Sequence, residues 1–567
     1  MAWWQKMIAP GMAWATRVMA ERACQTFDAQ AQAPAETNRA FLLRVLRENQ
    51  HTVFGKRYHF ESIQDEAEYR RRLPLSTYDD YEAEVERIAA GEASVLTVEP
   101  VIHLGLSSGT TGRQKRIPIT RSAQRHMARS MMFLTQGLLM RQVPAARKGG
   151  RGVMLMNATT SGRTAGGIST GAGTSSGMRS MLRMAPLLWT SPTEVYSVSH
   201  QPESGFLHLL FALREPDLAF LTAPFSSALV EMLNLLERRG DQLVLTLRTG
   251  KLPQTLNLPD ETRRALEAQL PPDPVTADRV AAALARGMAG IGLRLWPQLQ
   301  YIGTVTGGSF QVYGERLKYM VGNVPIHSSV YGATEAMIGV APAVETTAYA
   351  IAPDSAFFEF IPLEQVDDPA PQTLLLHELE VGQAYELVIT NPSGLYRYRL
   401  GDVVQVTGHY FKTPLVAFQY RRGQLLNLAG EKTLEQAVVQ GLLKATQTVG
   451  VPLLDFSTRP DIGVSPGRYR IYLELPEGVT VQTLEALTQA IDEALGVSNP
   501  RYREARNDGR LSPPRLDAVA PGTFQAVRTF LVSRGASQTQ VKVSRLLTNP
   551  EVLALVEARR QPVSLEG

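Results

Sequence analysis

The segment LGLSSGTTGRQKRIPIT, residues 104–120, constrains this chain more than any other. An apolar run leads into two serines, then two glycines that flank two threonines, and Lys115 precedes a second apolar run. Glycines let backbone N–H groups point at one centre, hydroxyls add further donors, and the lysine adds a positive charge. The segment therefore predicts a loop that binds polyphosphate, with a glycine-rich hairpin that binds nothing as the alternative.

Other motifs of similar composition fit less well. The segment contains neither a Walker A sequence nor a dinucleotide-binding fingerprint. Gly105–Gly109 and Gly173–Gly177 both match Gly-x-Ser-x-Gly, which in hydrolases places a nucleophilic serine directly before a helix. After Ser107 the loop continues instead, and no aspartate or histidine is marked as a partner. A hydrolase is therefore the weaker hypothesis.

Length and composition limit the classes of protein to which this chain can belong. The chain has 567 residues, too many for one ordinary core, so two or more domains are expected. Its 44% hydrophobic and 20% charged residues are typical of a globular protein. A net charge of +4, without any long basic run, argues against a nucleic-acid partner. Cys24 is the only cysteine, which suits a reducing compartment, and we expect a cytoplasmic protein.

The apolar N-terminus raises the question of a membrane. Lys6, Pro10 and Arg17 interrupt MAWWQKMIAPGMAWATRVMA, so the pattern does not favour a signal peptide. No run of eighteen apolar residues follows, and we expect no stable membrane insertion. The segment predicts an amphipathic helix that packs on the rest of the protein, with peripheral membrane contact as the alternative.

The hydrophobic pattern changes along the chain. Up to about residue 95 it has helical spacing, and after about 100 short apolar runs alternate with longer amphipathic ones, which indicates an α/β fold. The predicted strands are 101–106, 151–157, 299–305, 325–332, 356–362, 385–390 and 402–410, and the predicted helices are 121–140, 226–239 and 276–288. From about 422, with a helix from about Thr433, the pattern fits a small α+β domain.

Two segments allow two interpretations each. The Gly/Ser/Thr-rich stretch 157–177 is either a mobile loop over a site or a passive surface loop. Residues 175–189, rich in Met and Leu, either line an apolar pocket for an acyl group, with Met337 and Ile338 opposite, or form ordinary core.

Two further motifs carry polar groups at turns. In VYGATEAMIGV, residues 330–340, a strand and a tight turn precede Glu335, whose carboxylate suits a Mg²⁺ ion bound through phosphates. Tyr331 offers a ring for stacking on a purine. In YRYRLGDVVQVTG, residues 396–408, Asp402 follows Gly401 at the start of a strand, where an acid can hold ribose hydroxyls. Locally, an ordinary strand-turn and a turn aspartate explain them equally well.

The order of these motifs resembles the acyl-adenylate-forming, firefly luciferase-like superfamily. Within it the chain is most similar to the auxin-responsive acyl acid-amido synthetases, the plant jasmonate- and auxin-conjugating enzymes and their bacterial relatives. SSGTTGRQK, YGATE and YRYRLGD resemble the three motifs of that family. TVFGKRYHF and RRLPLSTYDDY extend the resemblance over nearly the whole chain.

The resemblance implies a large N-terminal adenylate-forming domain of layered sheets and helices, residues 1–420, and a small mobile α+β domain, residues 421–567, with the active site between them. A hinge is implied near Arg421–Gly423. The implied phosphate ligands are Ser107, Ser108, Gly109, Thr110 and Thr111, with Lys115 nearby. The other implied contacts are Tyr331, Gly332, Ala333 and Thr334 for adenine and the α-phosphate, Glu335 for Mg²⁺, Asp402 for ribose, and Arg421, Lys432 and Lys542 for the nucleotide. Ser544 stands where relatives usually have proline.

The implied activity uses ATP and Mg²⁺ to join a small carboxylic acid to the amine of an amino acid through an acyl-adenylate. An acyl-CoA ligase would share the first half of this reaction. A catalytically silent protein that binds an acyl acid or a nucleotide is the alternative from another class. The identities of the acid and the amine and the oligomeric state are not predicted.

Overall fold

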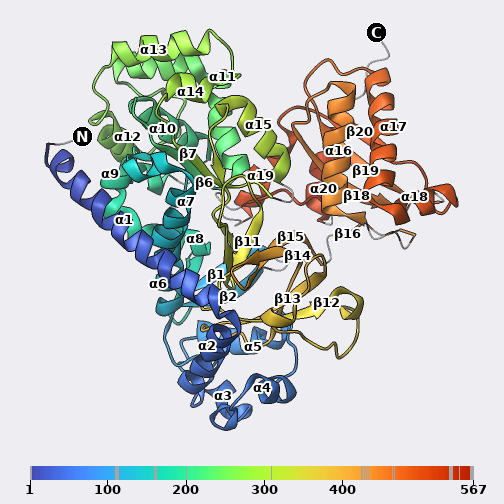
Figure 1. Cartoon of the computed structure of the whole chain (residues 1–567). Helices are drawn as coiled ribbons and strands as arrows, with labels where there is room; N and C mark the ends of the chain where they lie inside the picture. The colour runs from blue at the N-terminus through green and yellow to red at the C-terminus, as the bar shows by residue number, and fades with distance from the viewer. Residues whose placement is uncertain are drawn as a thin grey trace. The chain divides into compact units, whose positions relative to one another are not determined.

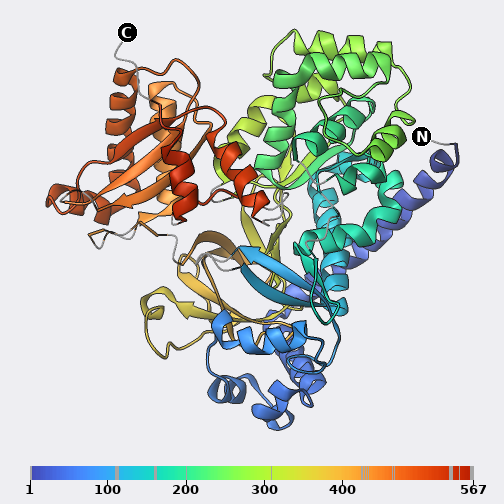
Figure 2. The same cartoon turned by 180° about the vertical axis from the view of Figure 1, so that it is seen from behind.

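The computed structural model describes residues 3–108, 114–156, 158, 162–198, 201–307, 310–422, 425–426, 428–429, 431, 433–462, 464, 466–534, 541–547 and 549–561. These residues form two compact units (Figure 1, Figure 2). The first lies within residues 3–108, 114–306 and 316–418, and the second within 307–315 and 419–561. In this part of the chain no helix is both long and apolar enough to span a membrane.

The N-terminal region is helical, as its periodicity predicts. Its helices are α1 (Trp3–Gln32), α2 (Pro34–Asn49), α3 (Val53–Arg57), α4 (Glu66–Arg72) and α5 (Glu82–Ala89). Helix α2 begins with Pro34, whose missing N–H costs nothing in the first turn, and buries a stripe that includes Phe41 and Val45. The side chain of Asp65 accepts a hydrogen bond from Glu68 N and so caps α4.

The first unit contains a parallel sheet in the order β3-β6-β7-β8. Its strands are β3 (Gly152–Met154), β6 (Phe220–Phe225), β7 (Tyr301–Val305) and β8 (Ile326–His327). The helices between them are α8 (Gly173–Met181), α9 (Ala185–Leu188), α10 (Gln201–Leu213), α11 (Ser226–Thr249), α12 (Asp260–Glu267), α13 (Pro274–Leu284), α14 (Ile291–Leu295) and α15 (Gln311–Val321). This alternation is the predicted α/β pattern. The predicted helix 226–239 continues to Thr249 beyond a kink at Arg239.

The predicted helix 121–140 contains a π-helical turn. It comprises α6 (Arg121–Arg129), a π-helical turn (Ser130–Leu134) and α7 (Thr135–Gln142). Periodicity does not reveal such a turn, because one inserted residue changes the hydrogen bonding without ending the helix.

A second, four-stranded sheet corrects the interpretation of residues 157–177 as a long loop. Its order is β2-β1-β5-β4, with strands β1 (Val101–Ser108), β2 (Gln114–Thr120), β4 (Gly162–Arg163) and β5 (Ser169–Gly171). The stretch therefore supplies two strands and the start of α8. Its Gly/Ser/Thr composition predicted a loop, but parallel pairing with β1 supplies backbone partners that local sequence does not reveal.

The third sheet of the first unit has seven strands in the order β12-β13-β14-β15-β11-β10-β9. They are β9 (Val330–Gly332), β10 (Met337–Val340), β11 (Ala348–Ile351), β12 (Phe357–Pro362), β13 (Ala384–Thr390), β14 (Tyr398–Tyr410) and β15 (Thr413–Arg421). Buried side chains of this sheet and of the N-terminal helices form one hydrophobic cluster, in which the rings of Phe54 and Tyr396 stack at 4.9 Å. The N-terminal helices therefore support the strands that carry the second and third motifs.

The second unit has a sheet in the order β18-β19-β20, formed by β18 (Asp455–Asp461), β19 (Arg468–Glu474) and β20 (Arg515–Val519). Alternate residues of β19 point to opposite faces. Ile471 packs with α16 (Glu435–Val449) and α17 (Val481–Ser498), and Tyr472 packs with α19 (Thr523–Ser533) and α20 (Pro550–Glu557). The remaining elements are α18 (Pro500–Asn507), β16 (Leu425–Leu426) and β17 (Thr433–Leu434).

One predicted boundary in this unit is wrong by two residues. The expected helix from about Thr433 begins at Glu435, because Thr433 and Leu434 first pair with Leu426 and Leu425 in a two-stranded ladder. Such short ladders carry little sequence signal.

Candidate active site

The strands of the first motif form an antiparallel pair. In β1 and β2, Ser107 lies opposite Lys115 and Ser108 opposite Gln114. Lys115 is therefore placed at the end of the pair where the predicted phosphate loop connects the strands. The loop residues Gly109, Thr110 and Thr111 lie outside the described part of the chain, and for Ser107 and Ser108 only the backbone is described.

The other edge of β1 is held by β5 through a buried histidine. Nδ1 of His103 lies 2.8 Å from the hydroxyl of Ser169, and Nε2 lies 3.1 Å from the carbonyl oxygen of Gly171. Burial lowers the pKa of His103, so the ring is neutral at pH 7. Because a carbonyl oxygen only accepts, Nε2 carries the ring hydrogen. β1 is therefore fixed on both sides.

The second motif forms a tight turn, as predicted. Strands β9 and β10 pair antiparallel, and Ala333 N donates to Ala336 O at 2.8 Å. The amide of Asn391 donates to the carbonyl oxygen of Glu335 at 2.7 Å, and its own oxygen accepts from Ser393 N and Leu395 N. Asn391 thus holds the turn that presents Glu335. Sequence reasoning missed it, although Asn-Pro-Ser-Gly directly before the third motif is a turn signal.

The first and second motifs touch at Gly105. A Cβ atom built at this glycine would lie 2.5 Å from Cγ2 of Thr334 and 3.0 Å from Cδ1 of Ile119. Only a residue without a side chain fits between β1 and the turn. The glycine is therefore explained by a close approach of two segments that are far apart in the sequence.

The second and third motifs meet at a buried carboxylate. Asp402 is 3% exposed on β14, directly after Gly401, whose φ of +80° suits glycine. The hydroxyl of Tyr331 donates to Oδ2 of Asp402 at 2.8 Å. The Tyr331 ring also packs against the rings of Tyr349 and Phe418, at 5.6 and 6.0 Å between centroids. Two residues that sequence reasoning assigned to one nucleotide are therefore in direct contact.

Lys115 also contacts β14. Its Nζ donates to the hydroxyl of Tyr398 at 3.3 Å and lies 5.7 and 5.9 Å from the ring centroids of Tyr78 and Tyr398. These distances allow a cation–π interaction with both rings. Sequence reasoning gave Tyr78 and Tyr398 no role, although they lie in the segments STYDDY and YRYRLGD that it singled out. β14, which carries part of the third motif, thus contacts the first motif through Tyr398 and the second through Asp402.

The arginines of YRYRLGD have a structural task. Arg397 is buried and adopts φ +48°, and its guanidinium lies 2.8 Å from the buried carboxylate of Glu359. Arg397 also donates to the carbonyl oxygens of Arg70 and Leu73. Arg399 pairs with buried Glu386 at 2.5 Å. These ion pairs fix the start of β14 and so the positions of Tyr398 and Asp402.

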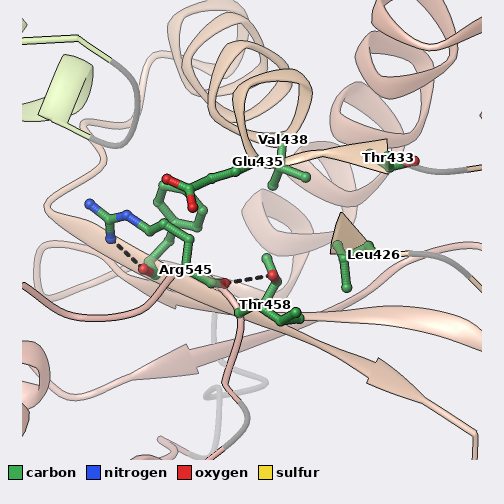
Figure 3. Close-up of a pocket in the computed structure, with 8 residues that line it drawn as sticks. Leu426, Thr433, Glu435, Val438, Thr458 and Arg545 are labelled. Atoms are coloured by element: carbon green, nitrogen blue, oxygen red, sulfur yellow. Dashed lines mark hydrogen bonds between the residues drawn. The ribbon is translucent and has the colours of Figure 1, made fainter. Parts of the chain in front are cut away.

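The remaining predicted residues belong to the second unit. Arg421 is the last residue of β15, and Nζ of Lys542 lies 6.0 Å from the ring centroid of Phe310. Lys432 lies outside the described residues. The unit also has a small hollow lined in part by Glu435, Thr458 and Arg545 (Figure 3). None of the predicted nucleotide-binding residues that the structure describes lines it.

The donors available to a metal ion are few. Among the described residues no three His, Cys, Asp or Glu side chains form a cluster that could hold an ion. That part of the chain therefore has no site with three or more such ligands. This fits Mg²⁺, which keeps several waters and uses one or two carboxylates together with substrate phosphates. Glu335, half-buried at the turn, is the carboxylate that the sequence motif assigned to such a role.

The proposed acyl-pocket residues lie in hydrophobic clusters. Met178, on α8, is buried against Trp189 and Tyr196, with Met181 packed beside it. Met337 and Ile338 are 3% and 0% exposed, on β10. Burial of this kind fits the alternative that these segments are core.

Comparison with known protein families shows which family this chain matches. The GH3 family N-terminal domain matches residues 23–326, the central domain matches 349–421 and the C-terminal domain matches 433–551. The chain belongs to the GH3 family. This GH3 protein is 31% identical over 520 residues to the indole-3-acetic acid-amido synthetase GH3.10 of Arabidopsis thaliana, which covers 85% of this chain and 86% of the relative.

Other relatives and solved structures agree. The GH3 protein is 28% identical over 558 residues to the jasmonoyl–L-amino acid synthetase JAR4 of Nicotiana attenuata, covering 95% of this chain and 96% of the relative. It matches the structure of the GH3.15 acyl acid amido synthetase with a TM-score of 0.85 at 28% identity, over 95% of this chain and 96% of that one. A 2-hydroxyisobutyryl-CoA ligase shares the fold, with a TM-score of 0.51 at 12% identity over 97% and 92% of the chains. The predicted family and fold class are confirmed.

Proposed function

We propose that this GH3 protein is an ATP-dependent acyl acid-amido synthetase. It activates a small carboxylic acid as an acyl-adenylate and transfers the acyl group to the amine of an amino acid, with release of AMP and pyrophosphate. One observation carries the proposal. The hydroxyl of Tyr331 donates a hydrogen bond to Asp402 at 2.8 Å, and Lys115 donates one to Tyr398 of the same strand, β14. These bonds bring residues of all three motifs together. The names of the relatives support the reaction class.

The proposed nucleotide contacts are those that the resemblance to the family implies. The loop of Ser107 to Thr111 and Lys115 hold the phosphates, and the 331–334 segment lines the adenine and the α-phosphate. Asp402 holds the ribose hydroxyls, since a carboxylate has acceptor positions beyond the one that Tyr331 uses. Glu335 provides the protein ligand for Mg²⁺, which when bound would neutralise phosphate charge.

In the first half-reaction an oxygen of the substrate carboxylate attacks the α-phosphorus of ATP. The bond to the bridging oxygen breaks, and pyrophosphate leaves with the electron pair. Since the attacking oxygen is already anionic, no general base is needed, and the protein's task is to orient the reactants and offset their repulsion. Lys115 and Lys542 supply positive charge for this purpose.

In the second half-reaction the neutral amine of the amino acid attacks the carbonyl carbon of the acyl-adenylate. AMP leaves, and the amine loses a proton as the amide forms. We propose residues 1–420 and 421–567 as the two domains, with a hinge near Arg421, and Lys432 as a second lysine that approaches the nucleotide. Cytoplasmic location remains part of the proposal, since Cys24 is buried and the sequence has no second cysteine.

The decisive experiment is acid-dependent ATP–pyrophosphate exchange with a panel of carboxylic acids. At least one acid should stimulate exchange well above the rate without acid. The acceptor is then identified by product mass after addition of amino acids or of coenzyme A. A thioester without an amide would favour the acyl-CoA ligase. Binding of nucleotide without exchange, over the whole panel, would favour the catalytically silent protein.

A further inference from the structure

We propose that Asp455 is a positioning residue for adenylation, which acts through Arg545 to fix the segment that carries Lys542. The inference rests on the proposed function, because it takes Lys542 to act on the nucleotide. It assigns a task to a buried acid that no sequence motif marks.

Asp455, the first residue of β18, is 3% exposed and bonded on both carboxylate oxygens. Oδ1 pairs with the guanidinium of Arg545 and accepts from Phe456 N at 2.9 Å. Oδ2 pairs with Arg528 at 2.8 Å and accepts from the hydroxyl of Tyr313. Burial alone would raise the pKa of Asp455, but the two arginines outweigh it and hold the pKa below the usual value. The acid is therefore ionised at neutral pH.

Arg545 is held at its guanidinium and at its backbone carbonyl. Its guanidinium lies 4.3 Å from the ring centroid of Phe456, and its carbonyl oxygen accepts from both the N–H and the hydroxyl of Thr458, each at 2.7 Å (Figure 3). The hydroxyl of Ser457 donates to the carbonyl oxygen of Ser544 at 2.7 Å. Leu547 N donates to the carbonyl oxygen of Thr458 at 2.8 Å. Residues 544–547 thus run along β18 as a short extension of the sheet.

Lys542 lies three residues before this anchor. Three extended residues span about 10 Å, so the anchor at Arg545 limits the positions that the lysine backbone can reach. Ser544 has no ring that would restrict its backbone, and its hydroxyl donates to the carbonyl oxygen of Leu546 at 2.6 Å. In this chain the segment therefore depends on bonds to β18 for its conformation.

The main test compares Asp455→Asn with Asp492→Asn. Asp492, on α17, is a matched control, because it also accepts from a tyrosine, Tyr502, at 2.6 Å and pairs with an arginine, Arg506, at 2.7 Å. Asp455→Asn should slow ATP–pyrophosphate exchange roughly 10- to 100-fold, the usual effect of misplacing a reacting group. Acyl transfer from preformed acyl-adenylate should change little. Asp492→Asn should leave the ratio of the two rates as in the wild type.

A combined variant separates positioning from general damage. If Asp455 acts through Lys542, adding Asp455→Asn to Lys542→Ala should slow exchange by less than twofold further. Fully multiplicative losses would overturn the inference. Because Asp455→Asn leaves buried Arg545 and half-buried Arg528 with less compensation, the milder pair Ser457→Ala and Thr458→Val provides a second test that keeps every charge.

Hydrogen exchange tests the anchor without reference to catalysis. Amides of residues 541–547 should exchange faster in Asp455→Asn, and in the Ser457→Ala, Thr458→Val variant, than in the wild type or in Asp492→Asn. If amide hydrogen exchange of residues 541–547 is the same in these variants as in the wild type, the inference is overturned. A wild type without acid-dependent pyrophosphate exchange overturns the proposed function itself. An active wild type in which Asp455→Asn behaves as Asp492→Asn overturns only the role of Asp455.

Discussion

A single hydroxyl, that of Tyr331, orients the buried carboxylate of Asp402. At 3% exposure its carboxylate has lost most of its water, and the Tyr331 hydroxyl replaces part of it. A hydrogen bond to an ionised group contributes about 1.5–3 kcal/mol, which is enough to fix the direction of the carboxylate. Orientation matters here because the proposed ribose contacts need two oxygens in defined places.

Replacement of Tyr331 by phenylalanine should therefore lower kcat/KM for ATP at least about tenfold, the effect of about 1.4 kcal/mol. The ring and its packing remain. Tyr410→Phe is the matched control, since Tyr410 donates to another acid of the same unit, Asp28, at 2.7 Å. Steady-state kinetics with varied ATP measures both variants. Equal losses in the two would show that the Tyr331 bond supports only the fold.

His208 predicts a dependence of stability on pH. It is fully buried, its Nδ1 lies 2.7 Å from the hydroxyl of Ser191, and burial lowers the pKa of the ring from 6.5 to about 3. Between these values the unfolded chain binds the proton and the folded one does not. The free energy of unfolding should therefore fall as the pH drops from about 6.5 towards 3, by about 1.4 kcal/mol for each pH unit.

The variant His208→Gln should lose less stability than the wild type between pH 7 and pH 5, by about 2 kcal/mol, because its side chain does not titrate. Urea unfolding at both pH values measures the difference. His409→Gln, at an exposed position, should retain the wild-type slope. A wild-type slope in His208→Gln would contradict the burial argument.

At the scale of the element, apolar runs located several strands. β1, β7, β12 and β13 fall where the pattern predicts them, because each buries a run of apolar residues. β14 begins at Tyr398, four residues before the predicted start at Asp402, and the predicted strand 325–332 is divided between β8 and β9, which belong to different sheets. Two strands that the pattern missed have no such run. Ser169–Gly171 becomes a strand through parallel pairing with β1, and Thr433–Leu434 through pairing with β16. Pairing with a distant partner determines these strands, and it leaves no mark on the local sequence.

The contact between β1 and the 333–336 turn predicts a strong effect of one methyl group. Gly105→Ala would place Cβ 2.5 Å from Cγ2 of Thr334, so the Thr334 side chain or the turn that carries it must shift. We expect a loss of about 1–3 kcal/mol in stability, as for other overpacked sites. Adenylation should slow more than tenfold, because two proposed nucleotide contacts shift at once. Thermal unfolding and pyrophosphate exchange measure the two effects.

A second substitution tests the cause. Thr334→Ser removes Cγ2 and keeps the hydroxyl, so the double variant Gly105→Ala, Thr334→Ser should recover part of both losses. Gly11→Ala serves as a control, because a Cβ at Gly11 meets nothing within 4 Å. Absence of recovery would mean that Gly105 is needed for another reason.

At the scale of the whole molecule, the sequence predicted the residues of the proposed site better than the residues that hold them in place. The three motifs predicted Lys115, the 331–335 turn and Asp402, and the contacts of the first unit bring these segments together. The supports were not predicted. Asn391, Tyr78 and Glu359 act over long sequence separations on backbone or on buried charge, and such partners are visible only in the folded chain.

The division into two units yields a prediction about the two half-reactions. Lys115 and Asp402 belong to the first unit and Lys542 to the second. If Lys542 serves the first half-reaction, Lys542→Ala should slow pyrophosphate exchange about 100-fold, as loss of one charge-stabilising donor does elsewhere. Amide formation from preformed acyl-adenylate should remain within a few-fold of the wild type. Equal losses in both half-reactions would rule out a role confined to adenylation.

The bonds of Asp455 also have a consequence for synthesis of the protein. Tyr313 emerges from the ribosome 142 residues before Asp455, whereas Arg528 and Arg545 follow it by 73 and 90 residues. Domains generally fold as units while the chain is still being made. Here the acid must wait for its two cationic partners, so the core of the second unit can close only after translation has passed Arg545. Until then the carboxylate of Asp455 stays hydrated, because its burial without the arginines would cost free energy.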